Sequence, residues 1–128
     1  MKRINPISKA KLPLANARTI LTEQANEQDR FYQNPEFVKL AGRTAFKGVL
    51  IALRAFFKLK SRDRRDIWWF EEQLGLIDER ISVHFDTTYQ FLYGFMGRRV
   101  NTDAVVASFA LQRADEIIQW VEQRTAAR

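Results

Sequence analysis

The chain contains a single imidazole, His84, which is the first residue to consider for acid–base chemistry at neutral pH. Each residue of a helix advances by about 100°, so His84 falls about 20° from Ile77, near the middle of an apolar side. We interpret it as a core or interface histidine hydrogen-bonded to a neighbour. Arg80 lies one turn earlier, so Arg80 and His84 could alternatively face one phosphate together as a catalytic pair.

Arg113 falls close to the middle of the apolar stripe of the last predicted helix, between Phe109 and Ile117. A charge at such a position must reach solvent, pair with a carboxylate, or meet a ligand or partner. We expect Arg113 to pair with an acid from the preceding helix. The alternative is a small anion pocket.

Other site chemistries find little support in the sequence. The chain has no Cys and one His, which excludes thiolate zinc sites, thiol nucleophiles and multi-His metal sites. Adjacent acids such as Glu71 and Glu72 diverge by about 100° on a helix, so neither converges with its neighbour on one ligand. No Gly-x-Ser-x-Gly motif and no Gly-rich phosphate loop occur. We expect no metal and no cofactor.

The central part of the chain is strongly basic. Residues 37–65 carry nine basic groups against one acid, Asp63. The candidate nucleic-acid footprint is a basic strip made of Lys39, Arg43, Lys47, Arg54, Lys58, Arg62, Arg64 and Arg65. Trp68 and Trp69 adjoin it and could stack on bases, or they could be core residues beside a solvated basic face. Since neighbours on a helix diverge, one of the two tryptophans should reach the surface or a partner.

The next segment is acidic, because residues 66–97 carry six acids against Arg80. A basic helix followed by an acidic one would attract each other inside a bundle. The same pattern describes a bipolar surface that could dimerise or attract a polyanion.

Nearly the whole chain has helical periodicity, with no alternating run that indicates a strand. We predict an all-α, antiparallel up-and-down bundle of four main helices plus one short helix. Pro13 should kink the first helix, which could instead begin near Leu12, and residues 27–34 should form a loop whose Phe31-Tyr32 pair packs on the bundle. A Gly75 interruption and a left-handed Gly97 should end the third and fourth helices. The expected helices span about 6–26, 35–59, 62–73, 76–97 and 102–125.

The second of these helices should be the most buried. It carries a seam of small residues at steps of 4, 3, 4 and 3, which lets another helix approach closely. The seam consists of Ala41, Ala45, Gly48, Ala52 and Ala55. Ser61 followed by Asp63 is expected to cap the short third helix, and Asn101-Thr102 the fifth.

The 128 residues fit a single domain, 1–128, with a core at about 5–124. The longest run without a charge, 87–97, is far shorter than the ~20 residues of a membrane span, and no apolar stretch of signal-peptide length follows Met1-Lys2-Arg3. We expect a cytoplasmic protein without a membrane partner.

Four stretches carry a resemblance to a family of small, uncharacterised bacterial helical proteins, covering about 5–121. They are the run from Phe31 to Leu53, Asn5-Pro6-Ile7, Tyr89 to Tyr93, and Ile117 to Val121. That family resembles, more distantly, the HEPN domains, helical bundles that include RNases and partners of nucleotidyltransferases. The resemblance implies a HEPN-like bundle and a homodimer.

The chain departs from the nuclease pattern of that resemblance. HEPN RNases carry an Arg followed, after four to six residues, by a His at the dimer interface. Here only three residues separate Arg80 from His84, and the segment 89–95 has neither residue type. We predict a non-catalytic, homo-oligomeric interaction module with a possible protein partner. The alternatives are a nucleic-acid-binding protein that uses the basic strip and a divergent RNase that uses Arg80 and His84.

Overall fold

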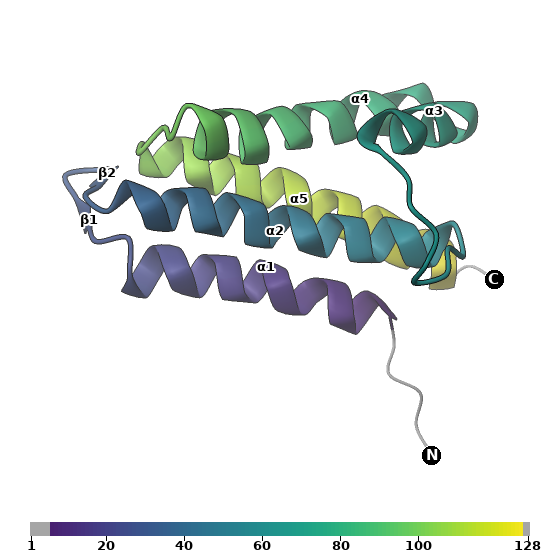
Figure 1. Cartoon of the computed structure of the whole chain (residues 1–128), viewed down its shortest axis with the longest axis horizontal. Helices are drawn as coiled ribbons and strands as arrows, with labels where there is room; N and C mark the ends of the chain where they lie inside the picture. Colours follow the sequence, from purple (N-terminus) through teal and green to yellow (C-terminus); the bar gives the residue numbers. More distant parts are fainter. Residues whose placement is uncertain (1–5, 127–128) are drawn as a thin grey trace, which may run out of the picture.

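The computed structural model describes residues 6–126, and side chains from 7 to 125. Asn5, which the sequence favours as the N-cap of a helix beginning at Pro6, lies outside the described residues. The chain is an all-α bundle, as predicted, in which each long helix runs opposite to the long helix before it in the chain (Figure 1). α1, α2 and α5 lie side by side, and α3, α4 and the π-helix η1 pack over them. The helices are α1 Pro6–Glu23, α2 Pro35–Phe56, α3 Ile67–Ile77, α4 Glu79–Tyr89, η1 Gln90–Arg98 and α5 Ala104–Ala126.

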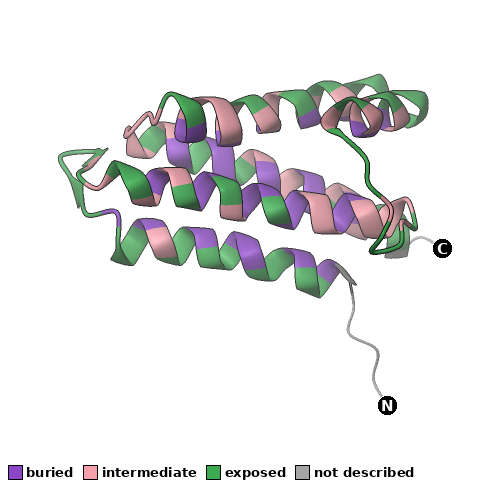
Figure 2. Cartoon of the chain, viewed as in Figure 1, coloured by how far each residue is buried: buried purple, intermediate pink, exposed green. Residues whose placement is uncertain are grey.

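The small-residue seam of α2 packs where the sequence placed it. Four of its five members, Ala41, Ala45, Gly48 and Ala52, are buried, whereas Ala55 is half-buried. The apolar stripe of α1, from Ile7 to Leu21, is buried too. A Cβ added to Gly48 would lie 2.6 Å from the carbonyl oxygen of Ala10 in α1. The two backbones can therefore approach only because Gly48 has no side chain. In Figure 2 the buried residues of α1 and α2, in purple, recur along the sides on which the two helices face each other.

Pro13 does not delay the start of α1. The helix begins at Pro6 and continues through Pro13, so the alternative start near Leu12 is wrong. Pro13 itself is buried against α2, where its ring lies 3.5 Å from the position of a Cβ on Gly48. The kink at Pro13 stays a prediction.

The predicted loop at 27–34 contains a short antiparallel hairpin, β1 Glu27–Gln28 and β2 Phe31–Tyr32. The hairpin is held against the start of α5, because Arg30 pairs with Asp103 at 2.8 Å and the Tyr32 amide donates to the Thr102 carbonyl. Tyr32 packs on the core, whereas Phe31 is 45% exposed. The expectation that both aromatic residues pack on the bundle holds only for Tyr32.

α3 is shifted along the chain relative to the prediction. Asp66, not Ser61, is its N-cap, and the Asp66 side chain accepts from the Trp69 amide at 2.9 Å. Gly75 lies inside α3 rather than interrupting it, because α3 continues to Ile77. Asp78 then caps α4 by accepting from the Arg80 amide.

The predicted fourth helix is two elements, since α4 passes into the π-helix η1 at Gln90. Gly97 does not adopt the expected left-handed conformation; among the described residues that follow η1, Val100 does, with φ 47°. Two other helix ends also differ from the prediction. α2 stops at Phe56 rather than near residue 59, and the left-handed Lys58 follows it. At the start of α5 the side chain of Asp103, and not of Asn101 or Thr102, accepts from the Val105 amide.

Candidate interaction surface

His84 lies at the contact between α4 and α5, as an interface histidine. Its Nε2 is 3.3 Å from the carbonyl oxygen of Arg113 and 3.3 Å from the Glu116 carboxylate. The side chain is 26% exposed. The imidazole therefore contacts groups of its own chain, and it lines neither of the two grooves described below.

Arg113 pairs with Glu116 of its own helix, at 2.6 Å, and not with an acid of the preceding helix as expected. Residues three apart on a helix are already neighbours, so this pair needs no tertiary approach. The guanidinium also lies 4.7 Å from the centre of the Phe109 ring. Its buried Nε has no hydrogen-bond partner among the described residues. Arg113 thus forms an ion pair with Glu116 and a cation–π contact with Phe109 beside the α4–α5 interface.

Arg80 does not join His84. Its guanidinium contacts Asp78 at the start of α4, and its side chain is 92% exposed. A side-chain hydrogen bond from Arg80 lowers the pKa of Asp78, helped by the backbone amide of Arg80. The Arg80 guanidinium is thus directed toward the helix cap, and the phosphate-facing pair with His84 stays a prediction.

The structure brings together two carboxyl groups that lie far apart in the sequence. Glu71 of α3 and Asp86 of α4 meet where these helices pack, next to the hydrogen bond that the Ser82 hydroxyl donates to the Glu71 carbonyl. Burial, and then the hydrogen bond and charge of Asp86, raise the pKa of Glu71 to about 7. Sequence spacing gave no signal for this pair. Within residues 6–126, no group of three or more His, Asp or Glu side chains could hold a metal ion.

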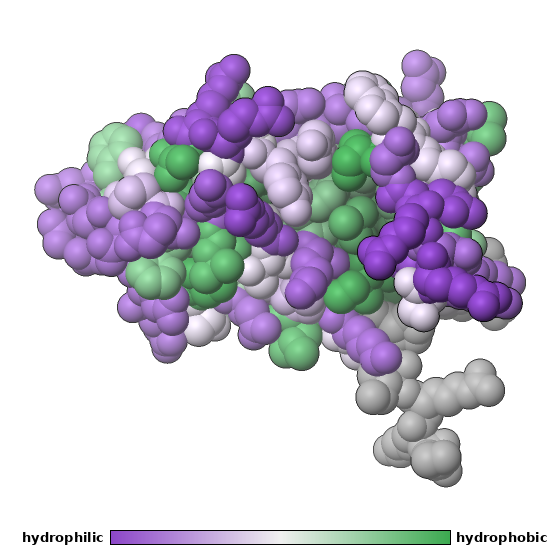
Figure 3. Space-filling view, in the orientation of Figure 1, coloured by the Kyte–Doolittle hydropathy of each residue, from purple (hydrophilic) through white to green (hydrophobic). Residues whose placement is uncertain are grey.

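A groove of about 710 Å³ lies between α1 and α2 on the face seen in Figure 3. We call it the α1–α2 groove. Five of its eleven lining residues are aliphatic and five are polar or charged, and the single aromatic side chain is Tyr93 of η1. The aliphatic residues are Leu12, Pro13, Leu40, Leu50 and Ile51. Leu12 is 62% exposed and Leu40 is 45% exposed, so part of this apolar surface faces water.

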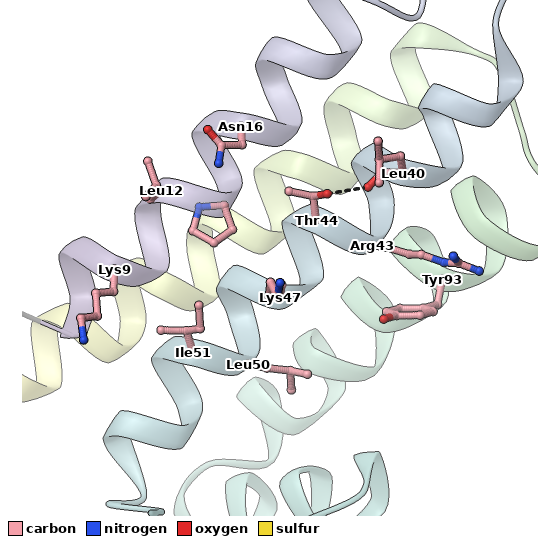
Figure 4. A pocket seen from close by; sticks show the side chains of 11 residues that line it. Lys9, Leu12, Asn16, Leu40, Arg43, Thr44, Lys47, Leu50, Ile51 and Tyr93 are labelled. Atoms are coloured by element: carbon pink, nitrogen blue, oxygen red, sulfur yellow. Dashed lines mark hydrogen bonds between the residues drawn. The ribbon is translucent and has the colours of Figure 1, made fainter. Parts of the chain in front are cut away.

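Three cations line the same groove: Lys9 of α1 and Arg43 and Lys47 of α2 (Figure 4). None makes a hydrogen bond or ion pair within the described part of the chain, and no carboxylate lines the groove. Lys9 was not part of the predicted strip. The strip was drawn along the second helix and the segment that follows it, whereas Lys9 lies on α1 and joins them only through packing.

A second groove, of about 730 Å³, adjoins the first through their common residue Leu50. It contains Arg54, Arg64 and Arg65 of the predicted strip. Its two acids already have partners, since Asp63 accepts from the Lys60 amide and Asp66 caps α3. The fold therefore collects five strip residues into two neighbouring grooves. The other three, Lys39, Lys58 and Arg62, line neither.

The outer side of α3 exposes large apolar side chains. Trp68 is 74% exposed and Leu76 is 77% exposed, with the exposed acid Glu72 between them. These three residues follow one another at steps of four, so they lie along one side of the helix, which we call the α3 stripe. Trp69 instead packs beside Phe57 and Phe70, so one tryptophan of the pair is at the surface, as predicted.

α4 also exposes a large apolar side chain and an acid. Val83 is 61% exposed, and Glu79 one turn earlier is exposed as well. Large apolar side chains gathered on a surface typically mark a place where a protein meets a partner. Within residues 6–126, no helix has both the length and the hydropathy to cross a membrane.

Comparison with known proteins identifies a family and a similar solved structure. The sequence profile of the family described as "Domain of unknown function (DUF5618)" matches residues 5–123. A protein of unknown function from Dyadobacter fermentans has the same fold, with a TM-score of 0.86 and 37% sequence identity over 94% of this chain and 95% of that one. No curated protein matches.

Proposed function

Since the chain belongs to the family of unknown function DUF5618, we propose from its own surfaces that it is a non-catalytic interaction module that assembles as a homodimer. The observation that carries the proposal is the α3 stripe, where Trp68 and Leu76 are three-quarters exposed. Leaving two such side chains in water forgoes the burial free energy of each, about 1.5–3 kcal/mol for a residue of this size. Covering them in an assembly recovers that free energy.

The arrangement of the polar residues supports a binding role over catalysis. His84 and Arg113 are both engaged with Glu116, and Arg80 is engaged with Asp78. A catalytic base must be able to reach a substrate proton, and a phosphate-binding arginine must face the same site. The divergent RNase that would use Arg80 and His84 therefore receives no support from these contacts.

Static light scattering across about 1–100 µM protein tests the proposal, a range in which interfaces of ordinary size associate. We expect a mass of twice the 15.0 kDa of one chain at the upper concentrations. A mass of one chain at every concentration contradicts the homodimer.

A second candidate function is nucleic-acid binding. Five residues of the basic strip gather in two adjoining grooves, and this arrangement favours binding of a polyanion. Fluorescence anisotropy with a mixed-sequence single-stranded RNA tests it. Binding should weaken steeply as salt rises, and it should weaken further in Arg64→Glu. No binding at low salt removes this candidate.

A further inference from the structure

We infer that the α1–α2 groove binds the α3 stripe of a second copy of this chain, an inference that rests on the homodimer proposed above. The stripe is not covered within its own chain, since Trp68 and Leu76 are 74% and 77% exposed. The groove is also open, with Leu12 62% exposed. Each copy therefore presents both an apolar stripe and an apolar groove. In a two-fold dimer both contacts form together, because the groove of each copy receives the stripe of the other.

The shapes of the two surfaces are suited to each other. A groove between two packed helices can receive a third helix, which inserts apolar side chains that recur along one side over one or two turns. The α3 stripe offers Trp68 and Leu76 two turns apart along one side. The groove offers aliphatic side chains from both of its helices, with Leu12 on α1 and Leu40 on α2 (Figure 4).

The charges of the two surfaces are opposite. The groove carries Arg43 and Lys47 without a carboxylate beside them in the described chain. The stripe carries Glu72, and the exposed Glu79 follows Leu76 by three residues, at the start of α4; neither acid makes an ion pair among the described residues. Complementary charge of this kind fixes the register of an interface and speeds encounter. The acidic segment of one copy thus faces the basic segment of the other.

The lining of the groove favours a helix over single-stranded nucleic acid as its occupant. Proteins that hold single strands combine cations with several aromatic platforms on which bases stack. Here Tyr93 is the one aromatic side chain among the lining residues, and the rest of the apolar lining is aliphatic. Aliphatic side chains pack well against a tryptophan and a leucine but offer no stacking surface to a base.

Charge reversal followed by mixing tests the inference. One variant reverses the groove, Arg43→Glu with Lys47→Glu, and the other reverses the stripe surface, Glu72→Lys with Glu79→Lys. We expect each variant alone to dimerise at least about tenfold more weakly than the unaltered chain, because both of its contacts then bring like charges together. The two variants mixed together should form a heterodimer, in which one contact is unaltered and the other pairs the reversed groove with the reversed stripe. Arg62→Glu and Glu23→Lys are the matched controls, because these exposed residues lie outside both surfaces. Sedimentation velocity measures each association constant.

The absence of Cys from the sequence permits a second test. Chains carrying Leu76→Cys are mixed with chains carrying Leu40→Cys and oxidised. A disulfide needs Cα atoms within about 7 Å of each other, so a linked heterodimer should form if the stripe docks in the groove. Leu12→Cys serves as an alternative groove partner, and Val105→Cys is the exposed control outside the groove. If the chain dimerises but neither charge reversal nor crosslinking responds, the inference fails while the homodimer stands. If the chain stays monomeric, both fail.

Discussion

Gly42 of α2 lies directly against the carbonyl oxygen of Leu92 in η1, so that an added Cβ would overlap this oxygen and crowd the Cβ of Met96 at 3.1 Å. Leu92 and Met96 are both fully buried. The backbone of the π-helix therefore rests on the backbone of α2 at a point where a side chain has no room. A π-helix is rare and wider than an α-helix, and this contact fixes where its widened turn meets the bundle.

Replacing Gly42 by Ala should destabilise the fold. In an open helical position this change stabilises by about 1 kcal/mol through helix propensity, but here backbone must shift, and overpacking of this kind costs about 1–3 kcal/mol. Gly75→Ala is the matched control, because its nearest neighbours lie at an ordinary 3.7 Å on Ser82. Urea denaturation of both variants measures the two free energies of unfolding. Equal effects at Gly42 and Gly75 would contradict the close contact with Leu92.

The Glu71–Asp86 pair should make stability depend on pH. The pKa of Glu71 is raised from 4.5 to about 7, so between these values the folded chain holds a proton that the unfolded chain has released. The contribution of Glu71 to the free energy of unfolding should then fall as pH rises from about 4.5 to 7 and level off above. Glu71→Gln keeps the neutral form at all pH values, and its stability profile should be flatter through this window.

Asp86→Asn separates the causes of that shift. Burial is the largest cause, so the pKa of Glu71 should move down toward 4.5 but not reach it when the Asp86 carboxylate is removed. An NMR titration of the Glu71 side-chain carboxyl measures this directly. A pKa that does not move in Asp86→Asn would show that the two groups do not interact.

The Arg113–Glu116 pair should contribute more to stability than a surface ion pair. Glu116→Gln leaves a guanidinium that is only 28% exposed without its carboxylate, and we expect a loss of about 1–2 kcal/mol. Glu122→Gln on the same helix breaks the well-exposed pair with Lys11 and should cost about 0.5 kcal/mol or less. Urea denaturation compares the two. A larger loss at Glu122 would reverse this ranking.

Asp66→Ala should destabilise α3 by about 1 kcal/mol, because it removes the side-chain acceptor for the Trp69 amide. Ser61→Ala should change stability by less than about 0.5 kcal/mol, since Ser61 is exposed and caps no helix. Thermal unfolding followed by circular dichroism distinguishes the two positions. The reverse order would support a helix that begins at 62.

The sequence by itself determined which faces of the helices are buried. The stripe from Ile7 to Leu21 and the small-residue seam of α2 follow from a helical period of about 3.6 residues, which depends only on neighbours along the chain. The same local logic predicted that Trp68 and Trp69 would point apart. It failed for the start of α3, because both Ser61 and Asp66 are plausible caps and local sequence does not rank them.

Only the tertiary structure decided which surfaces came together. Lys9 joins Arg43 and Lys47 because α1 packs on α2, and Glu71 meets Asp86 because α3 folds back along α4. Arg113 pairs with an acid of its own helix, because Glu116 lies three residues further along the same helix. Periodicity along one helix fixes the direction in which a side chain points. The partner it meets depends on how distant segments pack, which is set by the fit of whole helix faces.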